Sequence, residues 1–327
     1  MPVPPKNILV FCDGTGQDGL ITEEAPKDKA ANHFTNVLRL SRAISQTFVQ
    51  EDGEERAQIV FYQSGVGVAT DFNADEALSD NAKKAFASKI RDAYNFIAQN
   101  YREGDEISLF GFSRGAYTAR KISGLIDRLG LLPPAEMGKF FVYWKQLNKK
   151  LPGDPPRPSK PVPIKYKARS VWFSGAHSDV GGGYAEMELA DITLAWIVGE
   201  ICPYIGVNEE FVEKSLSNNT NKPKWGESTP HNAYVASGIL RPLMGRENRL
   251  SLITKDSVLH PSLLLAPDTK GMVTVSDLKK HLKVADLQAN TCELNEFEGR
   301  VRQFWHDTFR DADLPQFETQ ADEEGLV

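Results

Sequence analysis

Apolar runs and polar breaks along the chain predict alternating strands and helices. Three short apolar runs, each ending at turn residues, cover residues 8–12, 57–63 and 106–111. Such runs are typical of strands buried on both faces in a parallel sheet. Between the second and third runs, apolar residues recur every three or four positions, which predicts a helix over roughly residues 80–100.

The alternation continues beyond residue 113. Helical spacing after Ser113 predicts a helix that stops at Gly130, followed by a strand at 169–174 and a helix at 189–201. Elements that alternate without hairpin signals predict an α/β fold with a mostly parallel central sheet flanked by helices. Residues 152–163 contain six prolines, so we expect an extended surface connection in the middle of the chain.

Length and charge narrow the class of protein. The 327 residues suffice for one large α/β domain, which we assign to residues 1–310, with the acidic stretch 311–327 as a flexible tail. A net charge of −6 gives no support to nucleic-acid binding, which requires a basic face, and we expect no nucleic-acid partner.

Export and cofactor signals are absent from the sequence. Its three cysteines, Cys12, Cys202 and Cys292, lack the spacing of a disulfide framework or a metal site. The N-terminus lacks a signal-peptide pattern, and no run approaches the roughly 18–20 apolar residues of a membrane span. We expect no cofactor, no integral membrane segment and a cytoplasmic location, with export without a cleavable signal peptide as the alternative. No pattern indicates the oligomeric state.

The strongest chemical signal is Gly111-Phe112-Ser113-Arg114-Gly115, a G-x-S-x-G pattern between a predicted strand and helix. This context is what a nucleophile elbow requires, because the sharp turn exposes the serine hydroxyl above the sheet. The Arg114 N–H then faces a developing oxyanion. Asp13-Gly14-Thr15 ends the first strand at the same sheet edge, and the N–H groups of Gly14 and Thr15 are candidates for the second oxyanion donor.

A serine nucleophile needs a base and an acid that orients it, in the chain order Ser, Asp, His for this fold class. Asp179 and His260 keep that order and form the first assignment. His177, in the glycine-rich loop Gly175–Tyr184, is the base in a second assignment, oriented by another carboxylate. We assign no role to His231, His281 or His306.

Several segments resemble one known family, the α/β-hydrolase family that includes the catalytic domain of type VI secretion phospholipase effectors. The resemblance covers roughly residues 5–265 and rests on segments 7–16, 36–37, 62–67, 109–120, 171–184, 191–196 and 260–262. It implies an α/β-hydrolase fold, a Ser113/Asp179/His260 triad and hydrolysis of lipid or other esters. Family members usually carry a Trp-Asp-Thr segment after the elbow, whereas this chain has a shortened middle or lid segment at 133–168.

The leading function is therefore hydrolysis of carboxylic esters, from a small-molecule ester or lipid substrate, through an acyl-enzyme on Ser113. Two other functions remain open. Asp13, His177 and Asp179 are plausible hard-cation ligands for a metal-dependent hydrolase. A non-catalytic protein that binds acyl ligands on the same fold is the third reading.

Overall fold

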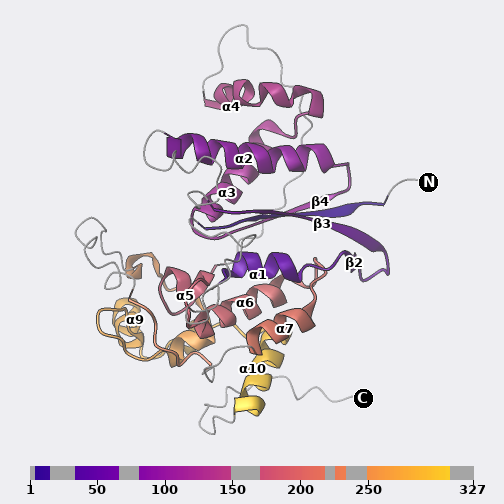
Figure 1. Cartoon of the computed structure of the whole chain (residues 1–327). Coiled ribbons are helices and arrows are strands. Elements are labelled where there is room, and N and C mark those ends of the chain that lie inside the picture. The colour runs from indigo at the N-terminus through magenta and orange to yellow at the C-terminus, as the bar shows by residue number, and fades with distance from the viewer. Residues whose placement is uncertain are drawn as a thin grey trace, which may run out of the picture.

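A four-stranded sheet forms the centre of the protein (Figure 1). The computed structural model describes residues 4–14, 34–65, 81–148, 170–217, 225–232 and 249–309. The strand order is β2-β3-β1-β4, in which β1 pairs in parallel with β3 and β4, and β2 pairs antiparallel with β3 at the edge. The strands are β1 (Lys6–Cys12), β2 (Thr47–Val49), β3 (Glu55–Gln63) and β4 (Glu106–Gly111). The three strands predicted from apolar runs are confirmed, and so is a mostly parallel central sheet.

Helices cover both faces of the sheet (Figure 1). On one face lie α2 (Asn81–Asn100), α3 (Arg114–Leu129) and α4 (Phe140–Asn148), of which α4 lies outside α2. On the other lie α1 (Asn36–Ala43), α6 (Glu188–Ile201), α7 (Glu209–Ser217) and α10 (Glu296–Phe309). The helices predicted at 80–100, after Ser113 and at 189–201 are confirmed as α2, α3 and α6.

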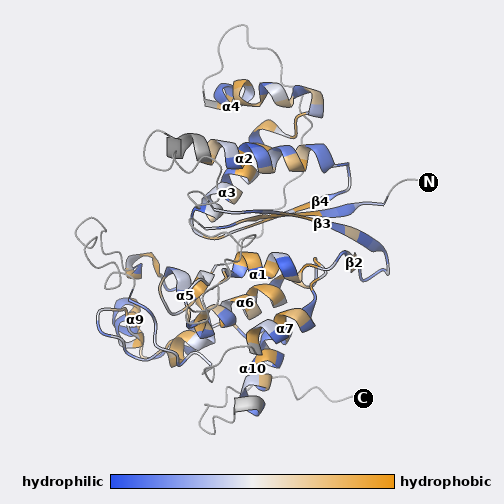
Figure 2. Ribbon diagram, viewed as in Figure 1, coloured by the Kyte–Doolittle hydropathy of each residue, from blue (hydrophilic) through white to orange (hydrophobic). Residues whose placement is uncertain are grey.

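The central strand β1 shows why its sequence is apolar without alternation. Ile8, Val10 and Cys12 pack into the core beneath α2 and α3, whereas Leu9 and Phe11 pack into the core beneath α1 and α6. Both faces of the strand are buried, and an uninterrupted apolar run is the pattern that this burial requires. Figure 2 shows the same division, with apolar residues gathered along the inner sides of the layers.

A second, smaller sheet lies apart from the first. It consists of β5 (Val171–Trp172) and β6 (Val258–Leu259), paired in parallel. The predicted strand at 169–174 is confirmed in position, with only two paired residues, and β6 was not predicted. Leu259 joins a third apolar cluster with Leu278 and Leu282 of α9 (Val275–Leu282). The helix α5 (His177–Gly181) directly follows β5.

The segment that precedes the proline-rich run is helical. A 3-10 helix at Pro134–Lys139 leads into α4, whose Phe140 and Tyr143 are buried against α2 and α3. The proline-rich run 152–163 and the tail 311–327 lie outside the described residues, and the domain boundary at 310 stays a prediction. Among the helices described, none has the length and apolar character that crossing a membrane requires.

Candidate functional site at the carboxyl edge of the sheet

The carboxyl ends of β1, β3 and β4 meet at one edge of the sheet. The strands end in register, because Cys12 lies opposite Gln63 on one side and Gly111 on the other. The Phe112 N–H donates to the Cys12 carbonyl at 3.1 Å, which ties the turn after β4 to the end of β1. The expected juxtaposition is present, since a Cβ on Gly14 would lie 3.3 Å from Ser113 Cβ.

Ser113 has an unusual backbone conformation. Its φ is 55° and its ψ −125°, at the position immediately before α3. Positive φ is uncommon for a residue with a Cβ, and such strain persists only where surrounding structure enforces it. Here the turn from strand to helix is too tight for a residue in the ordinary helical or extended regions.

The two glycines of the turn allow this close passage. A Cβ on Gly115 would lie 2.0 Å from the Cys12 carbonyl oxygen, and one on Gly111 would lie 2.6 Å from the Gly115 carbonyl oxygen. No side chain fits at these distances, so glycine is required at both positions by contact with backbone atoms rather than by φ. The turn Gly111–Gly115 is therefore tight, and it places Ser113 between the end of β4 and the start of α3.

The backbone N–H groups around Ser113 differ in what they bond. The Arg114 N–H, first in α3, donates to no acceptor among the described residues, as expected for the first N–H of a helix. The Gly14 N–H donates to Asp13 Oδ1 at 2.7 Å and is therefore engaged, which does not fit its expected part in the oxyanion hole. Thr15, the other candidate, lies outside the described residues.

Asp13 is buried, with 3% of its surface exposed, and its carboxylate is saturated by donors. Besides the Gly14 N–H, it accepts hydrogen bonds from the Thr35 hydroxyl at 2.8 and 2.9 Å and from the Tyr62 hydroxyl at 2.7 Å. Buried carboxylates are retained where such donors satisfy them. Asp13 therefore fastens the start of the loop after β1 to β3 and to the N-terminus of α1.

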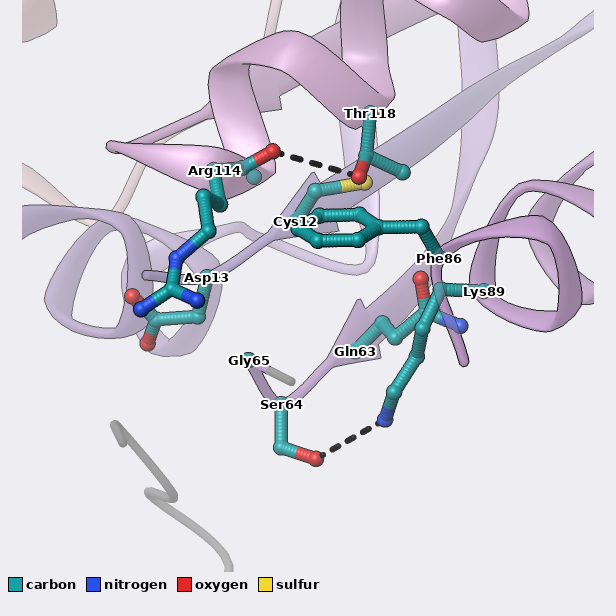
Figure 3. A pocket seen from close by; sticks show the side chains of 10 residues that line it. Cys12, Asp13, Gln63, Ser64, Gly65, Phe86, Lys89, Arg114 and Thr118 are labelled. Atoms are coloured by element: carbon teal, nitrogen blue, oxygen red, sulfur yellow. Dashed lines mark hydrogen bonds between the residues drawn. The ribbon is translucent and has the colours of Figure 1, made fainter. Parts of the chain in front are cut away.

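A pocket opens beside the turn, between β1, β3, α2 and α3 (Figure 3). Lys89 and Arg114 contribute its cationic side chains, and Lys89 Nζ donates to Ser64 Oγ at 3.3 Å. The other lining residues are Cys12, Asp13, Gln63, Gly65, Phe86, Gly115 and Thr118. Burial, with a smaller effect of the Asp13 charge, raises the pKa of the Cys12 thiol to about 12, so this cysteine is not a thiolate nucleophile at neutral pH.

The helix α5 packs against the turn through His177. The His177 ring stacks on Phe112 with centroids 4.5 Å apart, and a Cβ on Gly181 would lie 1.9 Å from the same phenyl ring. Residues 177 and 181 are four apart and share one face of the helix. Burial, with a smaller contribution from the charge of Arg249, lowers the pKa of His177 below its ordinary value. The imidazole next to the turn is therefore held in its neutral, basic form at neutral pH.

Asn36 fixes α5 from the side of α1. Its Nδ2 donates to the Ala190 carbonyl at 2.7 Å and to the Val180 carbonyl at 3.2 Å, and Thr193 Oγ1 donates to the Val180 carbonyl at 2.5 Å. The two bonds of Asn36 join segments that are more than a hundred residues apart in the chain. They give a structural reason for Asn36 and the start of α6 to occur among the segments that resemble the family.

Asp179 is paired with His231 rather than with His260. Only 2% of Asp179 is exposed, and its Oδ1 lies 2.6 Å from His231 Nδ1, while its Oδ2 accepts from the N–H groups of Ala176 at 2.6 Å and His231 at 2.9 Å. Sequence reasoning assigned His231 nothing. Its local sequence, Thr-Pro-His-Asn, carries no signal that distinguishes it from a surface histidine, and its contact with Asp179 spans 52 residues.

His260 lies in a different environment. It is fully buried, at 0% exposure, with Nδ1 2.7 Å from Ser262 Oγ and Nε2 2.7 Å from Glu298 Oε1. Both ring nitrogens are therefore engaged, and Phe173 stacks on the ring at 4.5 Å. The predicted Asp179–His260 pair is not formed in this structure, because the segment after β6 turns its histidine into the core between β6 and α10.

The three candidate cation ligands do not converge. Asp13 is held by Thr35 and Tyr62, Asp179 by His231, and His177 by its stack on Phe112. Within the part of the chain that the structure describes, no three His, Cys, Asp or Glu side chains are grouped as metal ligands would be.

Comparison with known protein families assigns the chain to one of them. Residues 6–163 and 159–200 match the family "T6SS, Phospholipase effector Tle1-like, catalytic domain", which together is more than half of the 327 residues. The chain belongs to this family. The matched residues of this Tle1-like chain include β1, β3, the turn Gly111–Gly115, α5 and most of α6, and the resemblance noted from its motifs is confirmed.

Among curated proteins, the Tle1-like chain is similar to "Uncharacterized protein YEL023C" of Saccharomyces cerevisiae, at 34% identity over 139 residues. The match covers 39% of this chain and 18% of the yeast protein, so the chain spans less than a fifth of that relative's length. No solved structure matches the chain significantly.

Proposed function

We propose that this Tle1-like chain hydrolyses lipid carboxylic esters through an acyl-enzyme formed on Ser113. The observation that carries the proposal is the strained conformation of Ser113, φ 55° and ψ −125°, between two glycines that contact backbone at the end of a parallel strand. Enzymes maintain such strain at sites where a side chain must be presented to a substrate. The family supports lipid esters as the substrate class, because its name describes phospholipase effectors.

His177 is the general base in this proposal. Its ring is stacked on Phe112, the neighbour of Ser113, and its lowered pKa keeps it neutral and able to accept the serine proton. His260 is the weaker candidate, because a base must reach both the nucleophile and water, and its buried ring nitrogens are engaged by Ser262 and Glu298.

Three groups of the protein take part in the proposed reaction: the Ser113 hydroxyl, the His177 imidazole and the Arg114 N–H. Ser113 Oγ attacks the ester carbonyl as His177 takes its proton, and the Arg114 N–H donates to the developing oxyanion. The protonated imidazole then gives its proton to the leaving alcohol. Water, deprotonated by the same imidazole, releases the acid from Ser113.

Replacing Ser113 with alanine tests the mechanism. We expect hydrolysis of p-nitrophenyl esters and of phosphatidylcholine to fall by at least about 10³-fold, as with loss of other serine nucleophiles. Ser64→Ala, which changes a second serine at the same sheet edge, is the matched control and should retain most of the activity. A fluorophosphonate should label the wild type at Ser113 only. Full activity of Ser113→Ala would refute the mechanism. A wild type that is neither labelled nor active would favour the alternative function, a non-catalytic protein that binds acyl ligands.

The identity of the base has its own test. We expect His177→Gln to lose activity while keeping its unfolding midpoint, whereas His260→Gln should lower the midpoint because His260 is fully buried. A folded His260→Gln enzyme with no activity, beside an active His177→Gln enzyme, would reinstate the triad predicted from sequence.

A further inference from the structure

Asp179 and His231 form a compact hydrogen-bonded pair outside the groups that the proposed mechanism uses. The buried carboxylate accepts from three nitrogens, namely Ala176 N, His231 N and His231 Nδ1, at 2.6, 2.9 and 2.6 Å. We refer to these two residues as the clamp. Because hydrogen bonds to a charged acceptor are stronger than neutral ones, the clamp is a firm attachment between residues 225–232 and the start of α5.

His231 is held from both sides of its ring. Its Nε2 lies 3.2 Å from Glu186 Oε2, and the Tyr184 ring lies 4.1 Å from it, centroid to centroid. Burial lowers the pKa of His231, but its hydrogen bond to Asp179 and the charges of Asp179 and Glu186 outweigh burial and raise the pKa overall. Both ring nitrogens of His231 thus lie at hydrogen-bond distance from carboxylates, those of Asp179 and Glu186. The His231 side chain remains 32% exposed.

The clamp and the turn lie on different sides of α5. Residues 177 and 181 face Phe112, and residue 179, two positions from each, lies on the far side of the helix. A Cβ on Gly175, whose φ is 111°, would lie 2.4 Å from Asp179 Cβ, so the chain enters α5 directly against the clamp. The five-residue helix is therefore held between Phe112 on one side and the clamp on the other.

A helix this short is not stable alone and takes its orientation from such attachments. We propose that Asp179 and His231 position α5 so that His177 is fixed against the turn, and that they act on the reaction only through His177. This inference rests on the proposed function, since it assigns His177 as the base. It makes His231 a positioning residue of the site.

His231 also meets two requirements of a triad base. Ser113, Asp179 and His231 follow the chain order of a catalytic triad, and Asp179 lies at hydrogen-bond distance from Nδ1 as a triad acid does. The surroundings favour positioning, because His231 Nε2 lies near Glu186, and the face of α5 that meets the turn carries His177. The experiment below separates the two roles.

Two substitutions at residue 231 provide the test. His231→Ala removes the Nδ1 donor, and His231→Asn keeps an N–H at nearly the same place without an imidazole. Displacing a catalytic group by about 1 Å costs on the order of 10²-fold, so we expect His231→Ala to lower kcat by about 10- to 100-fold with little change in KM. His231→Asn should recover most of that loss and keep the same acid limb in its pH profile. Asn232→Ala, which changes the adjacent side chain, is the matched control.

Amide hydrogen exchange tests the position of α5 independently of enzymatic activity. Amides of residues 176–182 should exchange faster in His231→Ala than in the wild type and return to slow exchange in His231→Asn. A His231→Asn enzyme as inactive as His231→Ala, with slow exchange restored, would show that the imidazole itself performs chemistry and would overturn the proposal. Unchanged kcat in His231→Ala would overturn it as well.

Failure of the proposed function is distinguishable from failure of the clamp. If a fluorophosphonate does not label Ser113 in the wild type, the serine mechanism itself is wrong. If it labels Ser113 in the wild type and His231→Ala at equal rates, the serine mechanism holds and the clamp does not position the base.

Discussion

Replacing Ser113 with glycine should stabilise the protein while abolishing its chemistry. The serine has a φ of 55° and a ψ of −125°, a conformation that glycine adopts without steric conflict. Backbone strain of this kind costs about 1–3 kcal/mol. Relief of this strain stabilises the folded state of the glycine variant. Glycine also gives the unfolded chain more conformational freedom, which offsets about 0.4–1 kcal/mol of that stabilisation. The net stabilisation is therefore roughly 0.5–2 kcal/mol.

Ser113→Ala is the reference for this comparison, because alanine also lacks the hydroxyl but keeps the Cβ and the strain. We expect Ser113→Gly to unfold at higher urea than Ser113→Ala, with the same m-value. For a chain of 327 residues, this difference in free energy corresponds to a rise of about 1–3 °C in melting temperature. Both variants should be inactive.

The result that refutes this reasoning is equal or lower stability of Ser113→Gly. Such an outcome would mean that the turn stores no strain at Ser113, and the principal support for a presented nucleophile would be lost. A changed m-value would instead indicate a change in the unfolded or native ensemble, and the comparison would then be repeated by calorimetry.

Three further predictions concern the turn, the core and the base. Gly115→Ala should prevent correct folding or remove activity, since its Cβ would lie 2.0 Å from a backbone carbonyl of β1; circular dichroism and ester hydrolysis check this. Glu298→Ala should lower the free energy of unfolding by about 3–5 kcal/mol, because it leaves Nε2 of the buried His260 without its carboxylate partner. Urea unfolding tests it against Glu296→Ala, whose side chain is 91% exposed and whose loss should cost at most about 0.5 kcal/mol; equal effects would refute it. Arg249→Gln should raise the pKa of His177 toward its ordinary value, because a nearby positive charge is lost, so the acid limb of kcat/KM should move to higher pH; an unmoved limb would argue against His177 as the base.

The same pH reasoning bears on the wild-type enzyme. A base must be neutral to accept a proton, so activity rises as the pH rises through the pKa of His177. Because that pKa is lowered, chiefly by burial, activity should persist below the ordinary value for histidine, about 6.5.

Local signals predicted three strands of the central sheet, β1, β3 and β4, and three of the helices that flank it, α2, α3 and α6. They did not predict β2, α1, α4, α7 or α10. The strand β1 is a run of residues buried on both faces, and the helix α3 has regular apolar spacing. In each element, the local pattern of apolar residues shows which faces are buried. The turn Gly111–Gly115 was equally readable, because its two glycines meet backbone that is either adjacent in the chain or one strand away. Steric requirements of this kind can be predicted from a few neighbouring residues in the sequence.

Contacts between distant segments were beyond those signals. The pairing of Asp179 with His231 rather than His260 depends on how residues 225–232 pass over α5, and the burial of His260 depends on α10, which carries Glu298. The engagement of the Gly14 N–H by Asp13 also needs the three-dimensional loop. Local sequence therefore predicted the parallel strands, the sharp turn at Ser113 and the family. The pairing of each histidine with its carboxylate could be known only from the folded protein, because hydrogen bonding between side chains depends on distances that chain order does not specify.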